Sequence, residues 1–276
     1  MIQYLYLGRV GYDEALRLQQ ELVDWRYRSR VENVLLLLEH PPVLTLGRNA
    51  DRSNVLAADE LLAARGVTLH EINRGGDVTY HGPGQLVGYP IFDLRSLHNP
   101  SGGRMGPVDF VRQMEEALIR LCGVYGVPAG RIAGLTGVWC SVTEPQVSSE
   151  VSRKIGAIGI HVSRGITSHG FAFNVTTNLD DFRLINPCGI TDRPVTSLER
   201  EMADPARVPA LESIAHQAAR QFGLVFGQPI LAVESLDALR AQAGAPNAQP
   251  PAEDTPLQVP AEVERLRGNV ERPVRA

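Results

Sequence analysis

Apolar and polar positions along this chain follow two different periods, which predict strands in some segments and helices in others. Residues 2–7 alternate and are rich in residues that favour strands, so they predict the first strand. Residues 11–30 predict a helix, because apolar residues recur there at helical spacing, at Ala15, Leu18, Leu22 and Trp25. Pro, Gly and Asn separate the later strand-like runs, which cover residues 33–40, 43–47, 67–72, 77–81, 85–94, 137–142, 153–162 and 169–175.

Two further helices are predicted between and after these strands. Residues 107–126 fit a helix that begins at Pro107 and ends at Gly126, and residues 209–223 fit another. The strands cluster instead of alternating regularly with helices, which is typical of an α+β fold with a mixed sheet. After about residue 240 the chain becomes polar and rich in Pro and Ala. We therefore predict one folded domain over residues 1–240 and a disordered tail over residues 241–276.

Composition narrows the class of protein. The chain has 276 residues, of which 43% are hydrophobic and 21% charged, as in ordinary soluble globular proteins. No apolar run approaches the roughly 20 residues that span a bilayer, and the N-terminus carries no export or organelle signal. Three cysteines at wide spacing fit a reducing cytosol better than a disulfide framework. We expect a cytoplasmic protein without a membrane partner, and the net charge of −4 argues against nucleic acid.

The three cysteines differ in their surroundings. Cys122 lies on the apolar stripe of a predicted helix and Cys140 alternates with valines on a predicted strand, so both are expected in the core. Cys188 lies in the turn-forming stretch "INPCGITDRP", between Pro187 and Gly189. A thiol in such a turn can reach a cleft where neighbouring charge favours the thiolate. Cys188 is therefore a candidate nucleophile, and the alternative is an incidental loop cysteine.

Lys154, in "SRKIGAIGIHV", is the only lysine of the chain. Every other basic side chain is arginine, although a solvated surface cation can be either residue. A lysine amine can be desolvated and can exchange a proton, whereas a guanidinium cannot. Lys154 is thus a candidate for proton transfer, and the alternative is a leftover surface charge.

Residues 73–90, "NRGGDVTYHGPGQLVGYP", hold the other dense group of polar and glycine positions. Gly75 and Gly76 permit a close approach of backbone to a ligand, and His81 lies in a Gly/Pro-rich loop. The alternative is a hairpin whose histidine has no role. The "GPGQLVG" spacing fails as a dinucleotide fingerprint. No phosphate-binding loop, C-x-x-C or metal-ligand spacing occurs, so no metal site is expected.

Three segments, taken together and in this order, resemble the sequence blocks of the octanoyltransferases of protein lipoylation. They are "RGGDVTYHGPGQLVGYP", "RKIGAIGIHVSRGITSHGFAFNV" and "INPCGI". The resemblance covers about residues 1–235, and the tail that follows matches no part of the family. It implies the α+β catalytic module shared by biotin and lipoate protein ligases, with a mixed central sheet flanked by helices, over residues 1–240.

The resemblance also implies a reaction. An octanoyl or lipoyl group would move from octanoyl-acyl carrier protein to a lysine of a lipoyl domain, in 2-oxoacid dehydrogenase complexes or glycine cleavage H protein, as the first step of endogenous lipoylation. Cys188 would carry the acyl-thioester and Lys154 would assist it. No ATP and no other cofactor is expected. Moving an acyl group from one thioester to another changes the free energy very little, and moving it from a thioester to an amide lowers the free energy. The substrate-contacting residues implied are Arg74, Gly75, Gly76, Asp77, Val78, Thr79, Tyr80, His81, Ala157, Ile158, Gly159, Gly170, Phe171 and Ala172.

Two secondary expectations and three alternatives accompany this interpretation. Leu86, Ile158 and Phe171 are candidates for the lining of an acyl tunnel, with ordinary core packing as the alternative. Arginines near its mouth would steer the acidic carrier protein, with Arg48, Arg74 and Arg153 as candidates. The alternative functions are an ATP-dependent ligase, a cysteine hydrolase that pairs Cys188 with His81 or His161, and a non-catalytic carrier-binding module.

Overall fold

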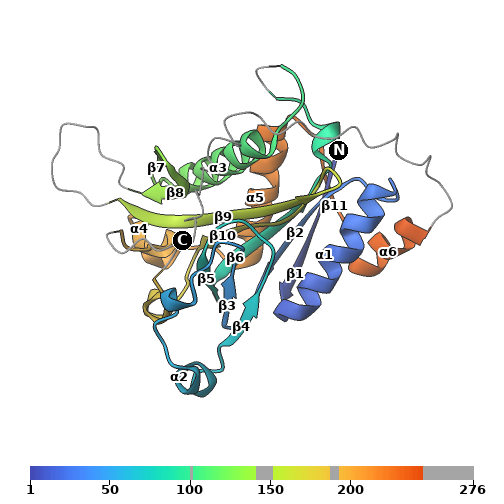
Figure 1. Cartoon of the computed structure of the whole chain (residues 1–276). Coiled ribbons are helices and arrows are strands. Elements are labelled where there is room, and N and C mark those ends of the chain that lie inside the picture. The colour runs from blue at the N-terminus through green and yellow to red at the C-terminus, as the bar shows by residue number, and fades with distance from the viewer. Residues whose placement is uncertain (100–101, 141–151, 187–192, 245–276) are drawn as a thin grey trace, which may run out of the picture.

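The computed structural model describes residues 1–99, 102–140, 152–186 and 193–244. Its largest element is a mixed eight-stranded sheet with the order β11-β1-β2-β6-β10-β9-β8-β7 (Figure 1). β1 pairs in parallel with β2 and β11, and the other neighbours are antiparallel. The strands are β1 (Ile2–Arg9), β2 (Asn33–Glu39), β6 (Gln85–Ile91), β7 (Ala129–Ile132), β8 (Leu135–Cys140), β9 (Arg153–Ser163), β10 (Ile166–Asn174) and β11 (Ile230–Ala232).

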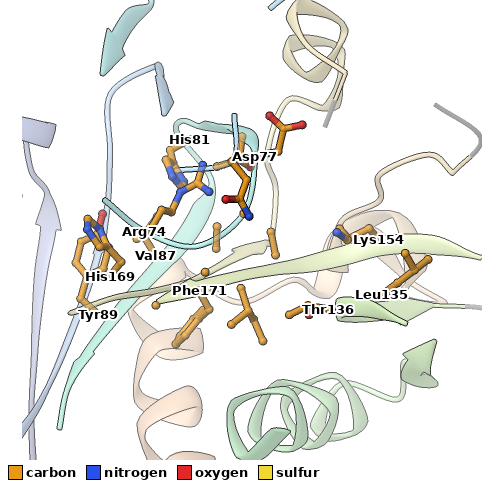
Figure 2. A pocket seen from close by; sticks show the side chains of 18 of the residues that line it. Arg74, Asp77, His81, Val87, Tyr89, Leu135, Thr136, Lys154, His169 and Phe171 are labelled. Atoms are coloured by element: carbon orange, nitrogen blue, oxygen red, sulfur yellow. The ribbon is translucent and has the colours of Figure 1, made fainter. Parts of the chain in front are cut away.

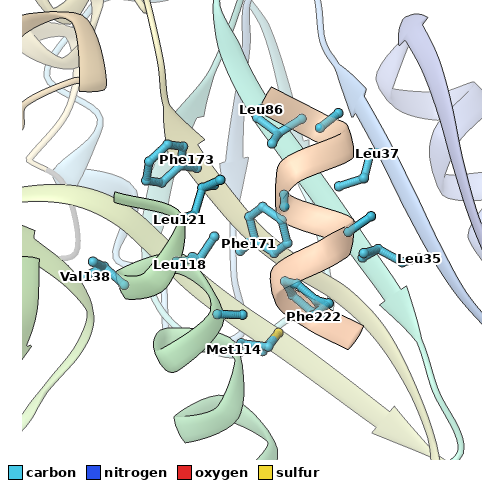
Figure 3. Close-up of a cluster of buried hydrophobic side chains, with 14 of the residues drawn as sticks. Leu35, Leu37, Leu86, Met114, Leu118, Leu121, Val138, Phe171, Phe173 and Phe222 are labelled. Atoms are coloured by element: carbon cyan, nitrogen blue, oxygen red, sulfur yellow. The ribbon is translucent and has the colours of Figure 1, made fainter. Parts of the chain in front are cut away.

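Helices cover both faces of this sheet, which confirms the predicted mixed sheet flanked by helices (Figure 1). α3 (Pro107–Val124) and α5 (Leu211–Phe226) lie on one face. α1 (Tyr12–Tyr27) and α6 (Leu236–Gly244) lie on the other. Each helix buries an apolar stripe, and Figure 3 shows α3 and α5 residues such as Leu118 and Phe222 packed against Phe171 of the sheet.

A second, three-stranded sheet extends from the first (Figure 1). It has the order β4-β3-β5 and consists of β3 (Val43–Leu46), β4 (Thr68–Glu71) and β5 (Val78–His81). Its own apolar cluster joins Leu44 and Tyr80 to Leu62 of α2 (Asp59–Ala64) and to Phe182. The other elements of the described residues are α4 (Leu198–Glu201) and 3₁₀ turns at Arg52–Asn54, Leu94–Ser96, Leu179–Leu184 and Pro205–Arg207.

The predicted domain boundary at residue 240 falls inside α6. Leu239 and Ala243 of that helix are buried and pack in the same cluster as Leu18 and Leu22 of α1. The fold therefore continues through residue 244, while residues 245–276, most of the predicted tail, lie outside the described residues. Within the described residues, no helix is both long and apolar enough to cross a membrane.

Candidate active site

A cavity of about 450 Å³ lies between the two sheets (Figure 2). β5 and the loop before it form one wall, β9 and β10 form another, and residues 134–136 at the start of β8 close one end. Three sequence segments that are far apart in the chain thus meet around one space. The predicted site residues that line it are Arg74, Gly76, Asp77, Thr79, His81, Lys154, Ala157, Ile158, Gly159, Gly170, Phe171 and Ala172.

Strand alternation separates the predicted residues of β5 into two groups. Thr79 and His81 line the cavity, whereas Val78 and Tyr80 point into the apolar cluster of the small sheet. The Tyr80 hydroxyl donates a hydrogen bond to Asp181 there (2.9 Å). Gly75 also lies outside the lining, and its backbone N–H donates to the Ile160 carbonyl of β9 (2.9 Å). These three predicted residues therefore build the wall without presenting a side chain to the cavity.

A bulge in β9 puts Lys154 on the cavity side. Val138 of β8 faces Gly156, but the next residue, Trp139, faces Lys154, so Ile155 is an extra residue on β9. Ile155 is fully buried in the main core, and a side chain at Gly156 would meet Val138 on that same face. Because these two consecutive residues share a face, the alternation reverses, and Lys154 lines the cavity together with the residues that follow the bulge.

The backbone of Lys154 is held on both sides. It lies opposite Trp139 on one side, and on the other its N–H donates to the Pro194 carbonyl (2.9 Å) while its carbonyl accepts from Thr196 (2.9 Å). Lys154 is only 8% exposed, and its Nζ lies 4.7 Å from the centre of the Trp139 ring. Figure 2 shows Lys154 at one end of the cavity, with His169 and Tyr89 at the other.

Cys188, the predicted nucleophile, lies outside the described residues. Described residues before and after it in the chain are linked to the lining by hydrogen bonds. The N–H of Asn186 donates to the Asn54 carbonyl (2.7 Å), and the Asn54 side chain donates to the Asp77 carboxylate, a lining residue (2.6 Å). On the other side, Pro194 is the residue whose carbonyl accepts from Lys154.

The other two cysteines are core residues, as predicted. Cys122 and Cys140 are fully buried in the main cluster. Burial raises the pKa of the Cys140 thiol to about 12 and raises that of the Cys122 thiol as well. Both thiols therefore stay protonated and unreactive at neutral pH.

The three arginines that were expected to steer the carrier protein differ in their exposure and in their partners. Arg74 is buried, and its guanidinium donates to the Thr45 carbonyl (2.8 Å) and to the Gly75 carbonyl (3.0 Å), so it braces the cavity wall. Arg153 makes a two-pronged ion pair with Glu201 (2.8 and 3.0 Å). Arg74 is therefore part of the cavity wall, which corrects the expectation that it faces an incoming carrier. The side chain of Arg153 is 35% exposed beside Glu201, so its role in steering stays a prediction. Arg48 alone of the three is exposed.

Two histidines beside the cavity have assignable tautomers. His40 Nδ1 must donate to the Val10 carbonyl (2.7 Å), so Nε2 accepts from the Tyr89 hydroxyl (2.7 Å). His81 Nδ1 donates to the Gln85 carbonyl oxygen (2.8 Å), because the Gln85 amide nitrogen donates elsewhere. Burial lowers the pKa of His40 to about 4 and that of His81 to about 3. Both imidazoles are therefore neutral at pH 7.

We expect acidification to destabilise the fold through His40, His81 and His169, since burial lowers the pKa of His169 to about 4 as well. An unfolded histidine binds its proton near pH 6.5, so the stability that these residues contribute is complete above that pH and is lost as the pH falls towards 4. At pH 5.5 each histidine should lower the free energy of unfolding by roughly 1 kcal/mol relative to pH 7.5.

Urea unfolding at pH 7.5 and 5.5 measures this loss. His81→Gln, which keeps a hydrogen-bond donor, should reduce the difference by about a third. His98→Gln, which removes an exposed histidine, should leave the difference in place. Equal stability of the wild type at the two pH values would contradict the expectation.

Several lining residues were not among the predicted site residues. Tyr12 comes from the start of α1, Tyr89 from β6, and Leu135 and Thr136 from the start of β8. Tyr12, Leu135 and Thr136 lie in segments whose pattern indicates only ordinary packing, whereas Tyr89 lies inside the block of residues 73–90 but was not named as a site residue. All three predicted tunnel residues, Leu86, Ile158 and Phe171, pack in or against the main core, and of these Ile158 and Phe171 also line the cavity.

Sequence comparisons give close relatives of the chain. Residues 11–223 match the family model described as lipoyl protein ligase A/B catalytic domain. An octanoyltransferase of Acidobacterium capsulatum is 61% identical over 85% of this chain and 94% of its own length. An octanoyltransferase of Koribacter versatilis is 52% identical over 96% of this chain and 97% of its own length.

Solved structures share the fold at much lower identity. A bipartite lipoate protein ligase of Thermoplasma acidophilum, from a study that includes its E2 lipoyl domain, aligns with a TM-score of 0.61 at 16% identity, over 87% of this chain and 89% of that one. A lipoate-protein ligase A bound with ATP aligns with a TM-score of 0.58 at 16% identity, over 88% and 93% of the two chains. The likeness is one of architecture, and it confirms the expected ligase-like catalytic module.

Proposed function

We propose, from the premise that this chain belongs to the lipoyl protein ligase A/B catalytic-domain family and to its octanoyltransferases, that it takes octanoyl from acyl carrier protein. The acceptor is a lysine of a lipoyl domain, in 2-oxoacid dehydrogenase complexes or glycine cleavage H protein. The acyltransferase activity follows from the family. The donor, the acceptors and the covalent route through Cys188 are the parts proposed.

The observation that carries the proposal is the cavity with the lone lysine at its end. Its volume of about 450 Å³ is within the range of small-ligand sites. Ala157, Ile158, Phe171 and Ala172 of β9 and β10 supply an apolar wall for an acyl chain, and Gly159 and Gly170 bring backbone to the surface. The only lysine of the chain lies at one end of this wall, where the reacting end of the acyl group would lie.

Acyl transfer proceeds in two balanced steps. The Cys188 thiolate attacks the carbonyl of the carrier thioester, the bond to the carrier sulfur breaks, and that sulfur leaves as a thiol after taking up a proton. The acceptor lysine amine then attacks the enzyme thioester, an amide forms, and the amine proton goes to the released Cys188 sulfur. No bond is formed to phosphate, so no ATP enters either step.

Lys154 is the group that supplies and takes the protons. As a neutral amine it takes the proton of the Cys188 thiol, and as an ammonium it returns a proton to the departing carrier sulfur. While protonated it also stabilises the thiolate by its charge. The hydrogen bond between its backbone and Pro194, in the segment that follows Cys188, supports this pairing.

The test is to mix purified protein with octanoyl-acyl carrier protein without any lipoyl domain, and to measure the intact mass followed by peptide mapping. We expect an octanoyl adduct on Cys188 that is discharged when a lipoyl domain is added. Cys188→Ala should form no adduct, and the buried Cys122 and Cys140 should stay unmodified.

Other outcomes identify the alternatives. Release of free octanoate without an adduct would indicate a hydrolase. Transfer from free octanoate that requires ATP would indicate a ligase. Binding of the carrier with its thioester left intact would indicate a binding module.

A further inference from the structure

We propose that Trp139 is a positioning residue for acyl transfer, because the face of its indole ring holds the Lys154 ammonium at the end of the cavity. The proposal rests on the function proposed above, in which Lys154 exchanges protons with the reacting sulfur atoms. It adds a residue that lies outside the three sequence blocks and outside the cavity lining.

The contact has the geometry of a cation–π interaction. Nζ of Lys154 lies 4.7 Å from the centre of the Trp139 ring, inside the range of about 6 Å over which the negative ring face attracts a cation. The two residues face each other directly across β8 and β9. Both are buried, with Trp139 only 1% exposed and Lys154 only 8% exposed. Burial strengthens the attraction, since little water competes for the ammonium.

No hydrogen bond explains why an indole occupies this position. The Trp139 Nε1–H is buried and has no hydrogen-bond partner among the described residues. A buried indole usually finds such a partner, so toward the described residues the edge of this ring offers nothing that a plain apolar ring lacks. The ring face, by contrast, meets two cations, because the Arg193 guanidinium carbon also lies 5.9 Å from the ring centre. The contacts of Trp139 therefore indicate that this residue acts through the contact between its ring face and the cations.

The strand that carries Trp139 is anchored firmly enough to position a partner. Glu115 of α3 is fully buried and accepts hydrogen bonds from the Gly137 backbone N–H (3.0 Å) and from Arg131 (3.1 Å). These bonds tie β8 to the helix two residues before Trp139. Gly137 has a φ of 125°, and a Cβ at this position would lie only 3.2 Å from Cε of Lys154. The missing side chain leaves room for the lysine stem to reach the ring.

Fluorinated tryptophans test the ring face while preserving the shape of the side chain. The chain has two tryptophans, Trp25 and Trp139. No described cation lies over Trp25, which packs on α1 in the second core, so Trp25→Phe should keep wild-type activity. In that background, residue 139 is made as Trp or as monofluoro-, difluoro- or trifluoro-tryptophan. Each added fluorine makes the face of the ring less negative and so weakens its attraction for a cation.

The readout is the single-turnover rate of enzyme acylation by octanoyl-acyl carrier protein, at saturating donor. We expect the rate to fall stepwise with each fluorine, to about a tenfold loss for the trifluoro ring, as for a cation–π energy of about 1.4 kcal/mol. The donor concentration for half-maximal rate and the midpoint of thermal unfolding should change little. A role in packing alone predicts no such trend, because the volume of the ring is nearly constant.

Two substitutions keep the proposal falsifiable if fluorination disturbs the fold. Trp139→Phe retains a ring face and should retain most of the acylation rate, whereas Trp139→Leu, which lacks one, should lose at least tenfold. Equal rates across the fluorine series, or equal rates for the Phe and Leu variants at matched unfolding midpoints, would overturn the role of Trp139. Absence of any acyl-enzyme in the wild type would instead overturn the proposed function and this inference with it.

Discussion

Replacing Lys154 with arginine is expected to lower octanoyl transfer by about a thousandfold while the protein folds normally. Arginine keeps the positive charge and a long apolar stem, so the contact with the Trp139 face can persist. What it removes is proton exchange, because a guanidinium stays protonated at any pH that the fold tolerates. The rate of acyl-enzyme formation, followed by intact mass after rapid quench, measures the effect.

A neighbouring arginine provides the matched control. Arg153 precedes Lys154 on β9, but its guanidinium pairs with Glu201 on the other side of the strand. Arg153→Lys preserves that charge pair and should leave transfer within about threefold of wild type. A Lys154→Arg enzyme that works as well as this control would show that the proton of Lys154 plays no part.

Substitution of Gly170 by alanine should destabilise the fold by at least about 3 kcal/mol. A Cβ at this position would lie 2.1 Å from the Gly88 carbonyl oxygen and 2.5 Å from Cδ of Pro90. Both atoms belong to β6, a fully buried strand in the middle of the sheet, so neither can move without disturbing its pairing with β2 and β10. Urea unfolding monitored by circular dichroism gives the change in the free energy of unfolding.

Gly123→Ala is the same chemical change at an open position. It lies on α3, where a Cβ would meet no atom within 4 Å. Alanine favours the helix over glycine there, by about 0.5–1 kcal/mol, so this variant should be as stable as wild type or slightly more stable. A Gly170→Ala protein that unfolds at the same urea concentration as Gly123→Ala would contradict the close approach of β6 and β10.

The state of His81 weighs against a cysteine hydrolase that uses this histidine as its base. A hydrolase of this kind needs a base that takes the thiol proton near neutral pH. Burial and the nearby His40 lower the pKa of His81 to about 3, and His81 Nδ1 is already committed to Gln85. His81 is a poor base in this setting and serves instead as a neutral, oriented part of the cavity wall.

The sequence predicted the long elements because a period needs several residues to show itself. α1, α3 and α5 each have 16 or more residues, and the predicted ranges overlap them closely. Although the equally short β3, β4 and β5 were predicted, β7 and β11, which have four and three residues, were not. Their existence depends on a partner strand, as when Ile230 pairs with Ile2 at the edge of the sheet. Such pairing is a property of the fold and leaves no local pattern.

The sequence by itself determined the family, the three blocks of candidate residues and the lone lysine, because each of these is written in a short contiguous segment. The tertiary structure decided which of those residues share a space. Lys154 and Ala157 are three positions apart and would lie on opposite faces of a regular strand. They line one cavity because β9 carries an extra residue, Ile155, opposite Val138. A bulge is a relation between two strands, so only their pairing could place the amine beside the acyl wall.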